Sequence, residues 1–149
     1  MSIKQKLYIH CQTVINNRLQ SIQKTIQEIH NALTSETKSS AGDKHETGRA
    51  MLQLEREKAG NQLAEIEKTR QILSKINIEN TSKTITLGSV VFTTQENYFI
   101  AISAGELFVE SQKFYAISAN SPIGQLLLGK MVGDEIIFRG QKFEIIKVL

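Results

Sequence analysis

Two carboxylates stand three residues apart in the stretch Ala41-Gly42-Asp43-Lys44-His45-Glu46-Thr47. Carboxylate oxygens suit Mg²⁺, which one or two carboxylates typically hold while waters and substrate phosphates complete its shell. Asp43 and Glu46 alone would make an incomplete Mg²⁺ site, so the missing ligands would have to come from a partner molecule. Phosphodiester cleavage with two metals is a reaction in which such a pair could recruit or steady the second metal.

A structural interpretation competes with the metal interpretation. Asp43-x-x-Glu46 at the start of a helix is a capping box, with Asp43 at the N-cap and Glu46 at N3. A cap would occupy some of the lone pairs that a metal needs. His45 lies between the acids, but no Cys/His spacing suits zinc, so we expect an exposed imidazole. Lys44 and Arg49 flank the acids and could contact phosphate or balance the local charge.

Two long helices should position these residues. Residues 2–34 contain no Gly or Pro, and apolar residues recur there in steps of four and three, the 3.5-residue period of a coiled-coil seam. Residues 34–42 are small and polar and predict a loop. A second helix should then run to about residue 78. The apolar positions of the two helices are Ile15, Leu19, Ile22, Ile26, Ile29 and Leu33, and then Leu52, Ala59, Leu63, Ile66, Leu73 and Ile76.

Two helices of similar length that are joined by a short polar loop predict an antiparallel hairpin. Its tip would lie at about residues 35–46, which contain both acids. A helix of about 33 residues is roughly 50 Å long at 1.5 Å per residue, which is longer than a small domain needs. The hairpin is therefore either a rod that reaches a partner or a dimerisation arm.

The composition changes after a polar linker at residues 79–83. Residues 84–94, 98–103 and 113–118 are rich in β-branched and aromatic residues and predict strands, with a further short strand at 107–110. A short helix should begin at an N-cap, Ser121, with Pro122 as its first residue and Gly129 just past its end. Strands at 135–139 and 142–148 complete a small α+β domain. We therefore expect a hairpin at residues 1–79 and a second domain at 80–149.

The net charge of +3 is unevenly placed, because residues 1–80 carry all of the excess. A basic rod could approach nucleic acid or an anionic channel, although a solvated helix face is the simpler explanation. The single Cys11 cannot form an internal disulfide and favours a reducing cytoplasm, with a buried thiol. The start Met-Ser-Ile-Lys-Gln-Lys lacks the apolar region of a signal peptide, and no apolar run approaches a membrane span.

At this point the chain resembles the Gre family of bacterial transcript-cleavage factors. The tip Gly42-Asp43-x-x-Glu46 is similar to the family's acidic tip, Gly-Asp-Leu-x-Glu-Asn. Residues 117–124, Ile-Ser-Ala-Asn-Ser-Pro-Ile-Gly, are similar to the family's C-terminal signature, of which Ser121, Pro122, Gly124 and Gly129 are the marked positions. The match continues through Leu128-Gly129-Lys130, Gly133-Asp134-Glu135 and the final Phe-Glu-Ile-Ile-Lys-Val at 143–148.

The resemblance implies an antiparallel coiled-coil hairpin followed by an FKBP-like domain with an antiparallel sheet and one short helix. It also implies a cytoplasmic elongation factor that binds RNA polymerase and is not itself an enzyme. In the family, the C-terminal domain docks at the rim of the polymerase secondary channel and the hairpin enters the channel. The tip acids, here Asp43 and Glu46, help to bind the catalytic Mg²⁺, so that the polymerase cleaves backtracked RNA. RNA and DNA would be met only within the elongation complex, and no cofactor would be tightly bound.

The sequence departs from the family around these acids. Lys44 and Thr47 stand where the family has Leu and Asn, and Gly48-Arg49-Ala50 replaces Ala-Glu-Tyr, so that a base has taken the place of an acid. A channel-binding inhibitor or modulator that does not stimulate cleavage is therefore the alternative. A prolyl isomerase or chaperone-like module is a rival, although the domain has no Trp for an aromatic pocket. A coiled-coil assembly protein is the last alternative, which the polar loop disfavours.

Overall fold

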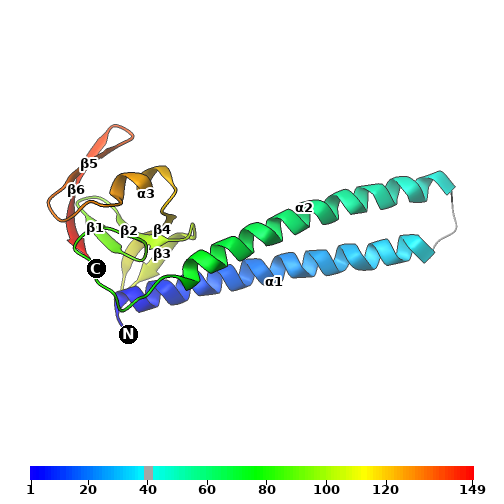
Figure 1. Ribbon diagram of the computed structural model, residues 1–149, viewed down its shortest axis with the longest axis horizontal. Coiled ribbons are helices and arrows are strands. Elements are labelled where there is room, and N and C mark those ends of the chain that lie inside the picture. Colours follow the sequence, from blue (N-terminus) through cyan, green and yellow to red (C-terminus); the bar gives the residue numbers. More distant parts are fainter. Residues whose placement is uncertain (39–41) are drawn as a thin grey trace. The chain divides into compact units, whose positions relative to one another are not determined.

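The chain begins with two long helices, α1 (Ile3–Lys38) and α2 (Gly42–Ser74), as Figure 1 shows. This computed structural model describes the backbone of residues 1–38 and 42–149, and the side chains of residues 1–36 and 46–149. By its contacts the chain divides into two compact units, Ile15–Arg70 and Met1–Val14 with Gln71–Leu149. We call them the hairpin unit and the sheet unit. Among the described residues, no helix is both long and apolar enough to cross a membrane.

An apolar seam holds the hairpin unit together. Ile22 and Ile29 of α1 and Ala59 of α2 are buried at its centre. Leu19, Ile26, Leu33, Leu63 and Ile66 are partly buried and pack against them. Ile22 lines the same groove as Ile66, and Ile29 lines another with Ala59, so the two helices run antiparallel. The structure confirms the seam that the sequence period predicts.

Both helices end at other residues than the sequence predicts. The first helix continues to Lys38 instead of ending near residue 34. The hydroxyl of Thr34 donates to the carbonyl of His30 at 3.0 Å, so this polar side chain bonds within the helix and does not cap it. The second helix ends at Ser74 instead of near residue 78. There the backbone N–H groups of Lys75 and Ile76 donate three residues back instead of four, which tightens the last turn and ends the helix.

Six strands form one sheet in the order β3-β4-β2-β1-β6-β5. Neighbouring strands are antiparallel except for β2 and β4, which are parallel. The predicted antiparallel sheet is confirmed, with this parallel pair as its exception. The cause is the tight hairpin of β3 and β4, which returns β4 beside β2 in the same direction. The strands are β1 (Val90–Thr93), β2 (Asn97–Ala101), β3 (Gly105–Val109), β4 (Gln112–Ser118), β5 (Glu135–Phe138) and β6 (Gln141–Val148).

The strand that was predicted from residue 84 begins only at Val90. Gly88, with a φ of 91°, turns the chain just before it. Ile85 is fully buried, yet its N–H donates to the carbonyl of Lys130 and its carbonyl accepts from the N–H of Gly129, each at 2.8 Å. The β-branched residues of this segment therefore lie in an irregular stretch. At Ile85 its backbone hydrogen-bonds to residues 129–130 and not to a strand of the sheet.

The main core of the sheet unit lies between the sheet and the short helix α3 (Pro122–Leu127), which Figure 1 shows beside the strands. Large aliphatic residues and one phenylalanine fill it, as expected for a sheet with one helix-covered face. The buried members are Ile85, Val91, Ile100, Ile123, Leu127, Ile136, Phe143 and Ile145.

The first turns of α1 belong to the sheet unit. Leu7 and Cys11 are completely buried, which confirms the expectation of a buried thiol. The hydroxyl of Tyr8 donates to the carbonyl of Leu73 at 3.3 Å. Lys6 forms an ion pair of 2.8 Å with Glu110, at the turn between β3 and β4. The sequence-based boundary at residue 79 thus differs from the division by contacts, which assigns Met1–Val14 to the second unit.

Candidate functional site

The first candidate site is the tip of the hairpin, where α1 ends and α2 begins. Glu46 and Arg49 are exposed there. Asp43 stands in the first turn of α2, which begins at Gly42. Residues 39–41 lie outside the described residues, as do the side chains of Asp43, Lys44 and His45. The roles predicted for these three side chains therefore stay predictions.

Residues 43 and 46 share one face of α2, because positions three apart on a helix are neighbours. Carboxylates on the first turns of a helix also lie at the positive end of its dipole. Among the residues that the structure describes, no three His, Cys, Asp or Glu side chains gather where they could hold a metal ion. The metal role of Asp43 and Glu46 therefore stays a prediction.

Glu36 is a further acid near the tip that sequence reasoning missed. Its carboxylate on α1 lies beside Gly48 on α2, 3.6 Å from the position that a Cβ at Gly48 would take. The polar run around Glu36 gives no helix signal, so only the continuation of α1 to Lys38 reveals its position. The three acids of residues 35–49 are matched in number by Lys38, Lys44 and Arg49, so this stretch carries no net charge.

The second candidate site is the C-terminal signature, whose polar residues build the start of α3. Ser121 is the N-cap, and its hydroxyl accepts from the N–H of Gly124 at 3.1 Å and donates to the carbonyl of Ser118 at 2.7 Å. Pro122 is the first helical residue, and Gly129 follows the C-cap with a φ of 81°. The structure thus confirms the predicted ends of this helix. The roles of the same residues in binding a partner stay predictions.

Gly124 has a steric role in the same turn. A Cβ at this position would collide with the carbonyl oxygen of Ser118 and come within 3.0 Å of the carbonyl of Ala119. Both obstacles are backbone atoms, which cannot turn away as a flexible side chain could. The glycine therefore lets α3 pack closely on the end of β4.

Exposed apolar side chains follow the signature. Leu126, Leu128, Met131 and Val132 lie within seven residues, and Val132 is 57% exposed. We call these four residues the apolar segment. The exposed Lys130 interrupts it. Exposed apolar groups gathered beside a basic residue are typical of a protein-binding surface.

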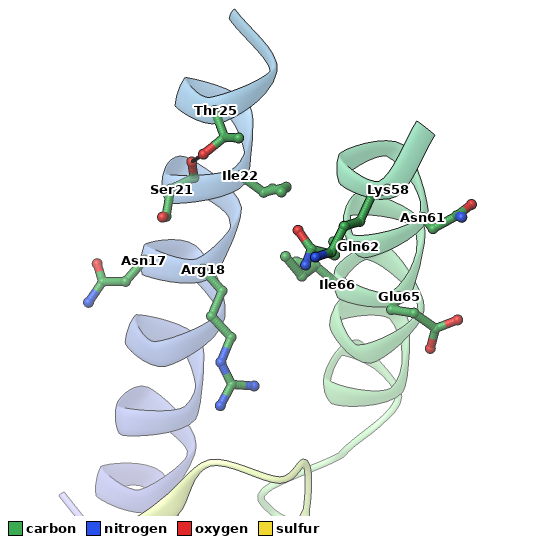
Figure 2. A pocket seen from close by; sticks show the side chains of 10 residues that line it. All are labelled: Asn17, Arg18, Ser21, Ile22, Thr25, Lys58, Asn61, Gln62, Glu65 and Ile66. Atoms are coloured by element: carbon green, nitrogen blue, oxygen red, sulfur yellow. Dashed lines mark hydrogen bonds between the residues drawn. The ribbon is translucent and has the colours of Figure 1, made fainter. Parts of the chain in front are cut away.

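A groove of about 820 Å³ opens between α1 and α2 within the hairpin unit. Figure 2 shows Ile22 of α1 and Ile66 of α2 pointing toward one another, whereas Asn61 and Glu65, which also line the groove, point away from α1. Two helices alone cannot enclose their own seam, because each apolar stripe is wider than the contact line between two cylinders. The groove is thus the uncovered side of the seam, and its lining has no arrangement suited to catalysis.

Comparisons with known proteins give a likeness of fold. No protein-family model matches the chain, and a search of curated proteins finds no match. The chain is similar to the solved structure of GreA factor homolog 1 (Gfh1) of Thermus thermophilus, with 21% identity, a TM-score of 0.36, and 91% of this chain and 92% of that chain covered. A structure described as the transcription factor Gfh1 has 23% identity, a TM-score of 0.35, and 90% of each chain covered.

Replacing Gly124 by alanine should destabilise the sheet unit. The new methyl group would collide with backbone carbonyls, so the turn between β4 and α3 must shift, at a cost of about 1–3 kcal/mol. Urea unfolding monitored by circular dichroism would measure the free energy of unfolding. An unchanged midpoint would show that the turn relaxes freely.

Replacing Gly48 by alanine should instead raise the free energy of unfolding. Glycine in a helix interior costs about 0.5–1 kcal/mol relative to alanine. A Cβ here would meet Glu36 only at ordinary van der Waals distance. The same urea titration should show a rise in the free energy of unfolding of that size. A loss of stability would mean that Glu36 cannot accommodate the methyl group.

Proposed function

We propose that this chain is a transcription elongation factor of the Gre type, which binds RNA polymerase and inserts its hairpin into the secondary channel. The observation that carries the proposal is the position of Glu46. It is exposed on the first turns of α2, with Asp43 one turn earlier on the same helix face. Beyond the sheet unit, α1 continues for 24 residues from Ile15 to Lys38, which corresponds to about 36 Å of helix that could carry a tip into a channel.

Asp43 and Glu46 would act by completing a Mg²⁺ site that the polymerase owns. Mg²⁺ when bound there would lower the pKa of a water molecule and stabilise the leaving oxygen of the phosphodiester. The chain's own contribution is to place two carboxylates and to hold them by the seam of α1 and α2. An exposed carboxylate such as Glu46 keeps its lone pairs available for a metal from another molecule. The chain is then an accessory factor and has no complete active site.

The sheet unit would provide the docking surface. The apolar segment that follows the signature offers exposed Leu, Met and Val side chains with Lys130 among them. An interface of this kind takes its affinity from apolar groups that become fully buried and its orientation from the charged rim. The backbone of the signature, fixed by Ser121 and Gly124, holds the segment in place.

A second function, binding without cleavage, is favoured by Arg49. This residue is exposed three positions after Glu46, so the two are neighbours on one face of α2. A guanidinium beside a carboxylate lowers the local negative charge and competes with a metal for its oxygens. The same chain could therefore occupy the channel and inhibit or retune the polymerase without supporting cleavage.

The cleavage function predicts that removal of either tip charge slows RNA shortening. Backtracked elongation complexes would be incubated with wild type, Asp43→Asn or Glu46→Gln, and the RNA length followed on a gel. Each isosteric amide removes one anionic ligand, so the cleavage rate should fall by on the order of 10- to 100-fold. Glu57→Gln is the matched control, because Glu57 is an exposed acid on the same helix three turns away from Glu46.

The outcomes of this assay separate the two functions. Shortening by wild type that is lost in both amide variants and kept in Glu57→Gln supports cleavage. Binding of wild type to the complex without shortening supports the modulator, and Arg49→Glu should then gain cleavage. Equal cleavage by wild type and both amide variants would remove Asp43 and Glu46 from the reaction. No binding at all would overturn both functions.

Docking through the apolar segment predicts a loss of affinity in Val132→Asp. The introduced charge would be desolvated against the polymerase, so the affinity should fall about tenfold or more. Phe108→Asp is the matched control, because Phe108 is 63% exposed on β3, at the opposite edge of the sheet from β5. Co-sedimentation or fluorescence anisotropy with core polymerase would measure both variants. Equal loss in both would contradict docking through this segment.

A further inference from the structure

A small polar pocket lies within the sheet unit, between the start of α1 and the segment that follows α2. Its volume is about 280 Å³. Two lysines, Lys4 and Lys75, line it together with Asn77, Asn80 and Ser82. None of the residues that line this pocket is acidic. The lining therefore combines two positive charges with amide and hydroxyl donors. Thr81 and Ser82 of this lining also line a larger pocket together with Met131 and Val132, so the polar pocket borders the apolar segment.

Lys4 is the unusual member of this lining. It is only 7% exposed, and its Nζ donates to the carbonyl of Asn80 at 2.6 Å. An ammonium carries three N–H donors, so this bond leaves two of them for other acceptors. No ion pair of Lys4 with a carboxylate is found in the described part of the chain. Lysine is almost never buried unless it is paired, so this pocket holds a positive charge that lacks its counter-charge.

Burial has a measurable consequence for this lysine. Desolvation lowers the pKa of the Lys4 ammonium below its ordinary value. Because the folded protein holds this proton less firmly than the unfolded chain does, the charged form costs stability at pH values below the lowered pKa. An anion in the pocket would offset that cost by supplying the missing negative charge.

We propose that this pocket binds a small phosphate-type oxyanion, with Lys4 and Lys75 as its charge partners and the side chains of Asn77 and Ser82 as neutral donors. A tetrahedral oxyanion accepts hydrogen bonds from several directions, which matches donors that come from different segments. The volume corresponds to roughly nine water molecules at about 30 Å³ each, which suits phosphate or pyrophosphate and is too small for a nucleic-acid strand.

Such an anion would join three segments of the sheet unit. Lys4 belongs to the first turn of α1, Lys75 follows the last residue of α2, and Ser82 lies in the linker that leads to the sheet. In the described part of the chain, the hydrogen bond from Lys4 to Asn80 connects α1 with this linker. The bound anion would add charge-assisted hydrogen bonds to both lysines and thereby raise the stability of the sheet unit.

The test is anion-dependent stability of the full chain in the absence of polymerase. Thermal unfolding and titration calorimetry would be performed with inorganic phosphate and with pyrophosphate, each against chloride at equal ionic strength. Wild type should gain several degrees in Tm at saturation. Lys75→Gln, which changes an exposed residue, should bind about tenfold more weakly. Lys4→Met should lose the response and, without anion, be as stable as wild type or more so, because it removes an unpaired buried charge.

Lys83→Gln is the matched control, since Lys83 is an exposed lysine of the same linker that does not line the pocket. A response to either anion that persists in this control and is lost or weakened in the other two variants supports the proposal. No response of wild type to phosphate or pyrophosphate would overturn it, as would equal responses of Lys75→Gln and Lys83→Gln. If Lys4→Met does not fold, the comparison of Lys75→Gln with Lys83→Gln still tests the proposal. The result does not depend on any binding to polymerase.

Discussion

The apolar seam between α1 and α2 is the interaction on which the candidate tip depends. Isolated helices are marginal in water, and most helical stability in proteins comes from packing of an apolar face. In the hairpin unit that packing rests on Ile22, Ile29 and Ala59 and their partly buried neighbours. Because two helices leave one side of their seam open, each buried group contributes a large share of the stability. The tip acids can be held at the start of α2 only as long as this seam is formed.

The seam was predictable from the sequence, whereas the ends of the helices were not. Apolar steps of four and three residues have no other regular structure to fit, so Ile15 to Leu33 predict their helix unambiguously. Helix ends depend on a few hydrogen bonds at single residues. The polar residues after Thr34 stay helical up to Lys38, while tightened bonds at Lys75 and Ile76 end α2 early. Neither event alters the apolar pattern, and therefore the pattern cannot predict it.

The sheet unit also contains a segment whose structure the sequence pattern does not predict. Ile85 lies in a run of β-branched residues that predicts a strand, yet tertiary hydrogen bonds to the Gly129–Lys130 segment place it outside the sheet. The signature at α3 was readable because its signals are local, a serine cap, a proline and a terminal glycine. Those same residues are occupied with building the turn. The side chains left for a partner are the exposed ones that follow, and no motif distinguishes Met131 or Val132 in the sequence.

The excess positive charge of residues 1–80 lies mostly outside the hairpin unit. The sequence places an excess of positive charge in residues 1–80 and suggests a basic rod. The structure assigns the early lysines to the sheet unit, where Lys4 is buried and Lys6 is paired with Glu110. Residues 15–70 then hold nine Lys and Arg against eight Asp and Glu, so the hairpin unit is almost neutral. Electrostatic attraction to nucleic acid becomes weaker as the net positive charge of a protein becomes smaller. Placement of individual acids such as Glu46, and not a basic surface, therefore has to account for what the hairpin does.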